Sequence, residues 1–285
     1  MSFAKIYTRG LLGLHAPQIE VEVHVSQGLP SLTIVGLPEA AVRESKDRVR
    51  SAIINSGFLF PTKRLTINLA PADLPKDGSR LDLPIALGIL IASGQLPENA
   101  TDNFEFIGEL ALDGHLRPVS GTLSIAMACQ QAEHQLMLPL ENADEAAQLP
   151  NFKVFAANHL KQVCEHFLNL HQINATKSPD ISFIPNCKFD LADVKGQLRP
   201  RRALEIAAAG GHSILFKGPP GTGKTLLASR LSSILPPLTA QENLEVASIY
   251  SIASTQHSFG QRPFRAPHHT ASAVALVGGG CQFHK

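Results

Sequence analysis

One short segment constrains this chain more than any other, namely Gly218-Pro-Pro-Gly-Thr-Gly-Lys-Thr225. It matches the pattern G-x-x-x-x-G-K-[ST] in full, which by chance is roughly a one per cent event in a chain of this length. Glycines let the backbone curl so that several N–H groups point at one phosphate chain. The start of a helix adds further free N–H groups and the positive end of its dipole. The segment therefore predicts a phosphate-binding loop between a strand and a helix.

The residues of this loop indicate a nucleoside triphosphate, ATP, bound with Mg²⁺. Lys224 is placed to reach the β- and γ-phosphates, and Thr225 to offer its hydroxyl to the metal ion. A plain glycine turn before a helix is the alternative, but it does not require lysine followed by threonine. The sequence assigns no catalytic residue. The predicted nucleotide-binding residues are Gly218, Pro219, Pro220, Gly221, Thr222, Gly223, Lys224 and Thr225, with Thr225 as the metal-binding side chain.

Composition is that of a folded protein, and the N-terminus and the cysteines favour a cytoplasmic one; the pattern of strands and helices described below predicts the α/β class. Hydrophobic residues make up 44% of the 285 residues and charged residues 17%, enough to form a core. The N-terminal segment does not read as a signal peptide, and the longest apolar run, Leu83–Ala92, is too short to cross a bilayer. The four cysteines are far apart and have no metal-ligand spacing, which favours reduced thiols: Cys129, Cys164, Cys187 and Cys281.

Charge is spread unevenly along the chain. Residues 1–184 hold 14 Lys and Arg against 19 Asp and Glu, a balance of −5. Residues 185–285 hold 11 against 5, a balance of +6. The second half is therefore the candidate for meeting phosphates or nucleic acid, although a solvated basic face explains the same numbers.

Turn and linker residues divide the chain into a first domain over 1–172, a linker over 173–188 and a second domain over 189–285. Periodicity in the first domain predicts strands and helices in alternation, with a hairpin arm at Phe104–Leu112. The expected strands are Gln18–Val25, Ser31–Val35, Arg64–Leu69 and Val154–Ala156, and the expected helices are Glu39–Ser56, Leu83–Ser93, Thr122–Glu133 and Asn158–Leu170.

The second domain shows a different pattern. A short apolar strand is expected at Ser213–Phe216, directly before the loop, and Val274–Val277 is a further strand candidate. The expected helices are Gly196–Ala209, Lys224–Leu235 and Gln241–Ser251.

Two weaker groups remain open. His268 and His269 could ligate a metal or sense a phosphate, but adjacent side chains on a strand point to opposite faces, so an ordinary hydrogen-bonded pair is favoured. Asp73, Asp77 and Asp82 could mark an acidic site, but turn and cap roles explain most of them.

Five segments together resemble the magnesium-chelatase-like AAA+ ATPases of the YifB and ComM group, which includes the competence protein ComM. They are Val35–Pro38, Pro71–Pro84, Asp193–Gln197, Gly218–Thr225 and Phe264–Thr270. The resemblance implies a Lon-protease-like N-terminal domain joined to an AAA+ module. It also implies homo-hexamers that move DNA branches during natural transformation. By the same resemblance Asp193–Gln197 lies beside the adenine, which adds Asp193, Val194 and Gly196 to the nucleotide-binding residues. The insertion of magnesium into porphyrin belongs to relatives with other partner subunits, and nothing in this sequence supports it.

The chain departs from this family in two respects. After Gly278-Gly-Gly280 the family continues into an acidic strand and an arginine finger, but here Cys281–Lys285 ends the sequence, so we expect ATP binding without appreciable hydrolysis. The serine and lysine of a Lon-type protease fall on Arg80 and Leu123, so no protease is expected. A Lon-type peptidase and a non-catalytic interaction module remain the alternative functions.

Overall fold

The computed structural model describes residues 3–76, 78–177, 189–253, 260–268 and 270–277. The chain divides into two compact units. The first comprises residues 1–182 and 244–257, and the second comprises residues 183–243 and 258–285. Among the described residues, no helix combines the length and the hydrophobicity that crossing a bilayer requires.

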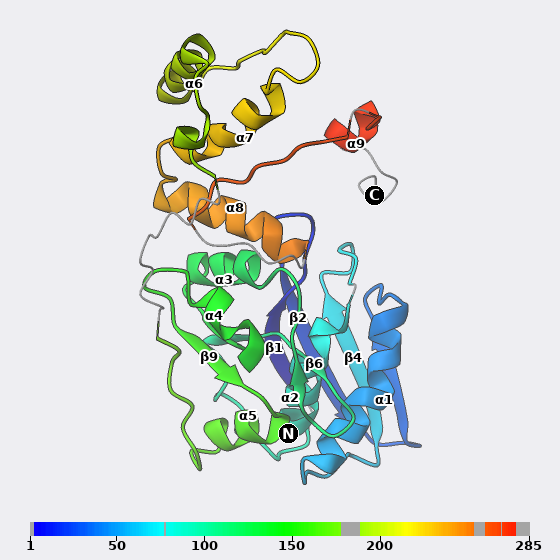
Figure 1. The fold of residues 1–285 in the computed structure, drawn as a ribbon. Helices are drawn as coiled ribbons and strands as arrows, with labels where there is room; N and C mark the ends of the chain where they lie inside the picture. Colours follow the sequence, from blue (N-terminus) through cyan, green and yellow to red (C-terminus); the bar gives the residue numbers. More distant parts are fainter. Residues whose placement is uncertain (1–2, 77, 178–188, 254–259, 269, 278–285) are drawn as a thin grey trace. The chain divides into compact units, whose positions relative to one another are not determined.

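A seven-stranded mixed sheet forms the framework of the first unit (Figure 1). Its strands run in the order β3-β4-β2-β1-β5-β8-β9. Strand β2 pairs antiparallel with β1 and with β4, whereas the other four pairings are parallel. The strands are β1 (Phe3–Arg9), β2 (Gln18–Ser26), β3 (Ser31–Val35), β4 (Arg64–Ala70), β5 (Phe104–Phe106), β8 (Gln135–Pro139) and β9 (Val154–Ala157).

Helices cover this sheet and complete the core. All eleven residues of α2 (Asp82–Ala92) are buried, and this helix packs against β1 and β2. Because α2 is apolar all round, it belongs between the sheet and other elements rather than at the surface. The remaining helices of this unit are α1 (Ala40–Asn55), α3 (Thr122–Gln131), α4 (Ala143–Ala146) and α5 (Leu160–Phe167), with short 3₁₀ turns at Ser79–Leu81 and Leu140–Asn142.

The region predicted as one hairpin arm, Phe104–Leu112, splits into two parts. Phe104–Phe106 is β5, a central strand that pairs parallel with β1 and β8. Only β6 (Glu109–Leu110) forms a hairpin, with β7 (Leu116–Arg117). The single-arm prediction was wrong because periodicity shows that a residue is half-buried but not which neighbour it pairs with. The sequence analysis also missed β1, β8 and α4, and it made α5 too long at both ends.

The second unit is helical in its described residues and has a small core. Its helices are α6 (Leu198–Gly210), α7 (Lys224–Ile234), α8 (Ala240–Ile252), whose residues from Leu244 onward group with the first unit, and α9 (Ala273–Val277), with a 3₁₀ turn at Leu191–Asp193. Four residues form the buried centre of this core: Leu191, Val194, Leu204 and Leu227.

Two predicted strands of the second unit are corrected. Ser213–Phe216 forms no strand, although its alternation persists: Ile214 and Phe216 pack on the small core, and Leu215 is 90% exposed. A strand needs a hydrogen-bonded neighbour, and none of the described residues pairs with this segment. Val274–Val277 lies in helix α9, so the strand prediction there was wrong as well.

Candidate nucleotide-binding site

The loop before α7 has the backbone shape that its glycines allow. Gly221 and Gly223 both have φ near 80°, a left-handed conformation that side chains with a Cβ disfavour. Gly223 is also the N-cap residue of α7, which begins at Lys224. The free N–H groups of the first helical turn therefore follow the loop directly, which is the arrangement that favours an anion.

Lys224 folds back over this loop instead of extending into solvent. Its Nζ donates to the carbonyl oxygens of Gly218 at 2.8 Å and Pro219 at 2.6 Å, and lies 3.4 Å from Thr222 Oγ1. Thr222 Oγ1 in turn donates to the Pro219 carbonyl at 2.9 Å. The ammonium group is thus held at the loop, where it can meet the phosphates of a ligand bound there. Thr225 is exposed on the first turn of α7.

The side chain of Gln197 connects this loop to the segment before α6. Its Nε2 donates to the Thr222 carbonyl at 3.2 Å. A Cβ added at Gly223 would lie 3.1 Å from the same nitrogen, so the glycine also makes room for this contact. Gln197 itself has a φ of 52° and precedes helix α6. The structure therefore places the end of the Asp193–Gln197 segment beside the loop.

A second connection is made by Arg230 on α7. Its guanidinium lies 4.5 Å from the ring centroid of Phe189, and its Nη2 is 3.5 Å from Asp193 Oδ2. The Arg230 side chain is 12% exposed, which enhances both contacts. The same Asp193 oxygen accepts the backbone N–H of Asp190, completing a capping box around the 3₁₀ turn.

The three additional nucleotide-site residues have different surroundings. Asp193 is engaged with Asp190 and Arg230, as described above. Val194 is 1% exposed and packs in the small core, so it can meet a ligand only through its backbone. Gly196 is exposed, with a φ of 69°. The sequence analysis missed Phe189 and Arg230. A signal for Gln197 was present, because it closes one of the five family-like segments.

Carboxylates that could hold a metal beside the loop are scarce. After Thr225 the sequence contains only Glu242 and Glu245 as acidic residues. Glu242 caps helix α8: its carboxylate accepts the backbone N–H of Thr239 at 2.8 Å and the Thr239 hydroxyl at 3.0 Å. These hydrogen bonds lower the pKa of Glu242. Among the described residues, no three His, Cys, Asp or Glu side chains gather as a metal site.

The weaker candidates take ordinary roles where they can be seen. His268 Nδ1 lies 2.7 Å from Thr270 Oγ1, an ordinary hydrogen bond, while His269 lies outside the described residues. Cys129 and Cys164 are buried free thiols, and burial raises the pKa of Cys164 to about 12. Cys187 and Cys281 lie outside the described residues, as does Asp77.

Asp82 is neither a cap nor part of an acidic site. Arg48 donates to both of its oxygens, at 2.8 Å and 3.1 Å, and the Leu110 N–H donates at 3.2 Å. Burial raises the pKa of Asp82 to about 6 despite these bonds. The cap interpretation was wrong because the residue's partners come from distant parts of the chain.

In the region that would correspond to a protease site, a serine, Ser79, is hydrogen-bonded to a glutamate, Glu109. The Ser79 hydroxyl donates to a carboxylate oxygen of Glu109. Leu123 is fully buried and apolar, and Arg80 is 8% exposed. The buried Lys76 donates its ammonium to the Pro71 carbonyl, and burial lowers its pKa.

Two family models match this chain. Residues 21–142 match the model described as subunit ChlI of Mg-chelatase, and residues 190–285 match the model described as magnesium chelatase, subunit ChlI. The chain belongs to the magnesium-chelatase ChlI family. Both matched regions lie where the sequence resemblance placed them.

Curated relatives agree with this assignment. The protein YifB of Salmonella typhimurium is 52% identical over 283 residues, and YifB of Escherichia coli is 50% identical over the same length. Competence protein ComM of Haemophilus influenzae is 48% identical over 288 residues. Each match covers 98% of this chain and 56% of the relative, so the chain spans about half the length of these proteins.

Proposed function

We propose that this chain binds ATP with Mg²⁺ at Gly218–Thr225. The observation that carries the proposal is the loop itself, which has left-handed Gly221 and Gly223 and an ammonium, that of Lys224, held over it. Loop N–H groups and Lys224 would hold the phosphates, and the exposed Thr225 hydroxyl would contact the magnesium ion. Membership of the ChlI family supports an ATPase of the AAA+ type.

The adenine side of the nucleotide would lie along Asp193–Gln197. Support comes from the Gln197 bond to the Thr222 carbonyl and from Arg230, which holds Asp193 to the phosphate-loop helix. Asp193 and Val194 would act by shaping this segment, since the carboxylate of Asp193 has partners and Val194 is buried. Gly196 leaves the backbone open for a planar base.

Binding can be tested with Lys224→Ala and a matched control, Lys217→Ala. Lys217 is exposed at the other end of the loop, so its substitution removes the same charge from the same neighbourhood. Lys224→Ala should weaken magnesium-dependent ATP binding by about tenfold or more, because charge-assisted contacts are each worth a few kcal/mol. Lys217→Ala should change it by about twofold or less. Equal affinities for ATP in wild type and Lys224→Ala would contradict the assignment of the binding site to Gly218–Thr225.

We further propose that these 285 residues bind ATP without turning it over appreciably. Hydrolysis needs a carboxylate on the metal and a group that orients water. Of the two acidic residues after Thr225, Glu242 already caps a helix. Phosphate release by purified protein, with and without DNA, tests this point. Turnover near about one per second that Lys224→Ala abolishes would contradict the proposal.

The role of the whole protein is proposed from its relatives. ComM of Haemophilus influenzae is named a competence protein, which supports a role in competence. The resemblance of the sequence to the YifB and ComM group extends this proposal to the processing of DNA, through branch migration by hexamers during natural transformation. The positive balance of residues 185–285 supports a nucleic-acid partner. Stalled DNA junctions resolved by full-length protein and ATP, but not by the Lys224→Ala variant, would support this role, and unchanged junctions in both samples would contradict it.

The first unit is proposed to be a Lon-like domain without peptidase activity. Ser79 donates to a carboxylate rather than to a lysine, and a carboxylate so placed cannot replace the buried amine that a Ser–Lys pair requires. A casein digest measures this directly. Cleavage that disappears in Ser79→Ala would show that the serine is a nucleophile after all.

A further inference from the structure

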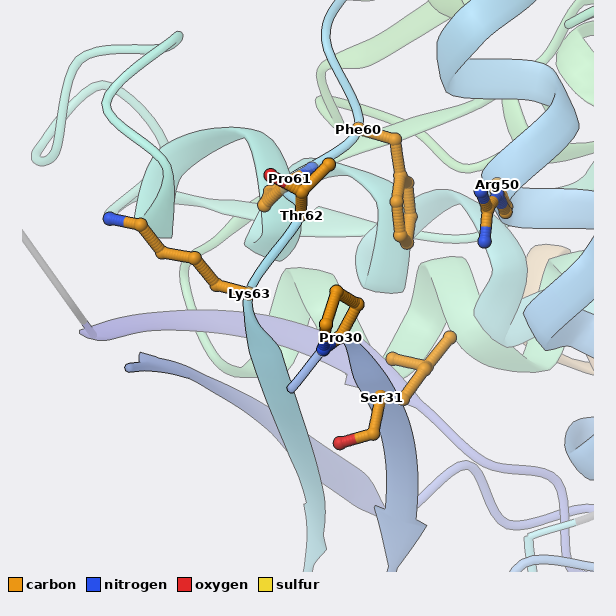
Figure 2. A pocket seen from close by; sticks show the side chains of 8 residues that line it. Pro30, Ser31, Arg50, Phe60, Pro61, Thr62 and Lys63 are labelled. Carbon is orange, nitrogen blue, oxygen red and sulfur yellow. The ribbon is translucent and has the colours of Figure 1, made fainter. Parts of the chain in front are cut away.

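Two hollows in the first unit share the segment Phe60–Lys63, just before β4. The smaller, drawn in Figure 2, has a volume of about 110 Å³ and is also lined by Pro30–Leu32 and Arg50. The larger, about 450 Å³, adds Leu59 and Gln95. Both belong to the first unit and are separate from the nucleotide loop in the second.

The loop that carries this segment is fixed by hydrogen bonds. The Gln95 side chain accepts the Leu59 N–H at 2.8 Å and donates to the Leu59 carbonyl at 2.7 Å. The same Gln95 nitrogen donates to Ser93 Oγ at 2.8 Å. Although its backbone is held in place, the Leu59 side chain remains 79% exposed, and Leu29, next to Pro30, is 87% exposed. These hydrogen bonds fix the loop at the rim of the larger hollow, which Leu59 and Gln95 line.

The half-buried side chain of Phe60 lines both hollows. The guanidinium carbon of Arg50 lies 5.3 Å from the centroid of the Phe60 ring. Figure 2 shows the ring standing between Arg50 and the side that carries Pro61 and Thr62. The rest of the ring packs partly against the core, so a planar group could meet only the part of it that lines the hollows. A cation on one face and a planar group on the other are both favourable for an aromatic ring.

The charged side chains around the two hollows are positive. Arg50 and Lys63 line the hollows, no carboxylate does, and Arg64 is the strand partner of Ser31 in the smaller one. Within the described part of the chain, no ion pair or hydrogen bond engages the charged groups of these three side chains. Residues 1–184 as a whole carry more acidic than basic side chains, 19 against 14. The basic edge is therefore a local feature of an acidic unit.

We propose that Arg50, Phe60, Lys63 and Arg64 form a binding site for single-stranded nucleic acid. A base stacks on the part of the Phe60 ring that lines the hollows, and neighbouring phosphates meet the cations, which is the combination that single-strand binding uses. A duplex keeps its bases stacked on one another and cannot use that ring. An acidic peptide would use the cations but not the ring. The proposal names a site for the DNA-processing role proposed above, and it rests on that role.

The test is the binding of a fluorescently labelled oligothymidylate to the full chain at low salt, followed by anisotropy. Phe60→Leu keeps apolar bulk but removes the ring, and should weaken binding about fivefold or more. Lys63→Gln should weaken it and lower the dependence on salt by about one phosphate contact. Lys153→Gln, the same charge change at an exposed lysine before β9, should leave affinity unchanged. Phe60→Tyr keeps the ring and should bind like wild type, which separates stacking from a loss of folding.

The possible failures are distinguishable. Wild type that binds no oligothymidylate overturns both this site and the DNA role. Wild type that binds, with Phe60→Leu and Lys63→Gln equal to Lys153→Gln, overturns the site alone. Competition by polyglutamate as effective as unlabelled oligothymidylate identifies an acidic peptide as the occupant and also overturns it.

Discussion

Arg9 in the first unit and Arg230 in the second both meet a carboxylate, but in opposite settings. Arg9 donates from Nε to Glu105 Oε2 at 2.5 Å and from Nη2 to Oε1 at 2.7 Å, and the two side chains are 9% and 0% exposed. Arg230 approaches Asp193 at 3.5 Å, and the Asp193 side chain is 52% exposed. The first pair is part of a core, whereas the second joins two segments at a surface.

The partners of Glu105 show how a core tolerates a charge. Burial alone would raise the pKa of Glu105, but hydrogen bonds from Arg9, Cys129 and His134 together outweigh burial, and the pKa is lowered. Every acceptor position is used, so the buried charge is compensated. In the described residues of the second unit the core cluster is small, with four buried residues at its centre, and local backbone rules shape the loop instead. The difference teaches that the first unit is held by long-range packing and the nucleotide loop by local conformation.

The largest expected effect comes from removing the buried charge. Glu105→Gln leaves Arg9 uncompensated in the core and should lower the free energy of unfolding by about 3–5 kcal/mol. Asp193→Asn, the matched change in the second unit, should lower the free energy of unfolding by about 1 kcal/mol or less, because the ion pair of Asp193 and Arg230 is partly exposed. Urea unfolding followed by far-UV circular dichroism measures both. Equal losses of stability in the two variants would contradict the conclusion that the Arg9–Glu105 pair is part of a core and the Arg230–Asp193 pair is not.

Within the first unit, Asp82 and Glu105 should make contributions to folding stability that depend on pH in opposite directions. The pKa of Asp82 is raised to about 6 from an ordinary 3.8, so the folded state holds its proton more tightly than the unfolded chain does. Asp82 therefore contributes to the free energy of unfolding fully below about pH 4, and this contribution is lost as pH rises through 6. The loss amounts to about 3 kcal/mol. Glu105 acts in the opposite direction, because its lowered pKa stabilises the fold above about pH 4.5.

Asp82→Asn isolates the first of these effects. Urea unfolding of wild type and variant between pH 4 and 7 should show the wild type losing stability relative to the variant as pH rises. A difference that is constant with pH would mean that Asp82 stays ionised when buried, with Arg48 fully compensating it.

A smaller effect is expected in the second unit, at Gly223. Alanine there would adopt a φ near 80° and place its Cβ 3.1 Å from Gln197 Nε2. The strain is about 1–2 kcal/mol, which should weaken ATP binding about tenfold or more by disturbing the loop. Gly211→Ala is the control: its φ is 64°, but nothing lies within 4 Å of the added Cβ. Calorimetric titration with ATP should show weakening in Gly223→Ala only. Equal weakening in both would indicate a general loss of stability.

The smallest effect is expected at the start of α8. Thr239 and Glu242 form a reciprocal cap, with the Glu242 N–H donating to Thr239 Oγ1 at 3.2 Å. Thr239→Ala should lower helix stability by about 1 kcal/mol, and Thr239→Ser should retain it. Amide hydrogen exchange in the first turn of α8 measures the change. Similar exchange in Thr239→Ala and wild type would mean that packing alone holds the helix end.

Much of the local structure could be predicted because it depends on neighbours in sequence. The β3 range, Ser31–Val35, matched its period of two from end to end, and α7 begins at the lysine that follows the loop glycines. Such features need only side-chain alternation, glycine freedom and helix capping. The predicted range of α5 was too long at both ends, because it included Asn158 and the left-handed Asn169, and asparagine favours turns.

The sequence by itself predicted the family, the helix that follows the glycine-rich loop at Gly218–Thr225, and most helices and strands of the first unit, because each is encoded in residues close together along the chain. Only the tertiary structure decided that Phe104–Phe106 is a central strand, that Arg9 meets Glu105 across 96 positions, and that Arg230 meets Asp193 across 37. These outcomes depend on which distant elements come together. A buried charge or an unpaired strand edge must be hydrogen-bonded, and the fold determines which group lies close enough to do so. The spacing of residues in the sequence does not predict that partner.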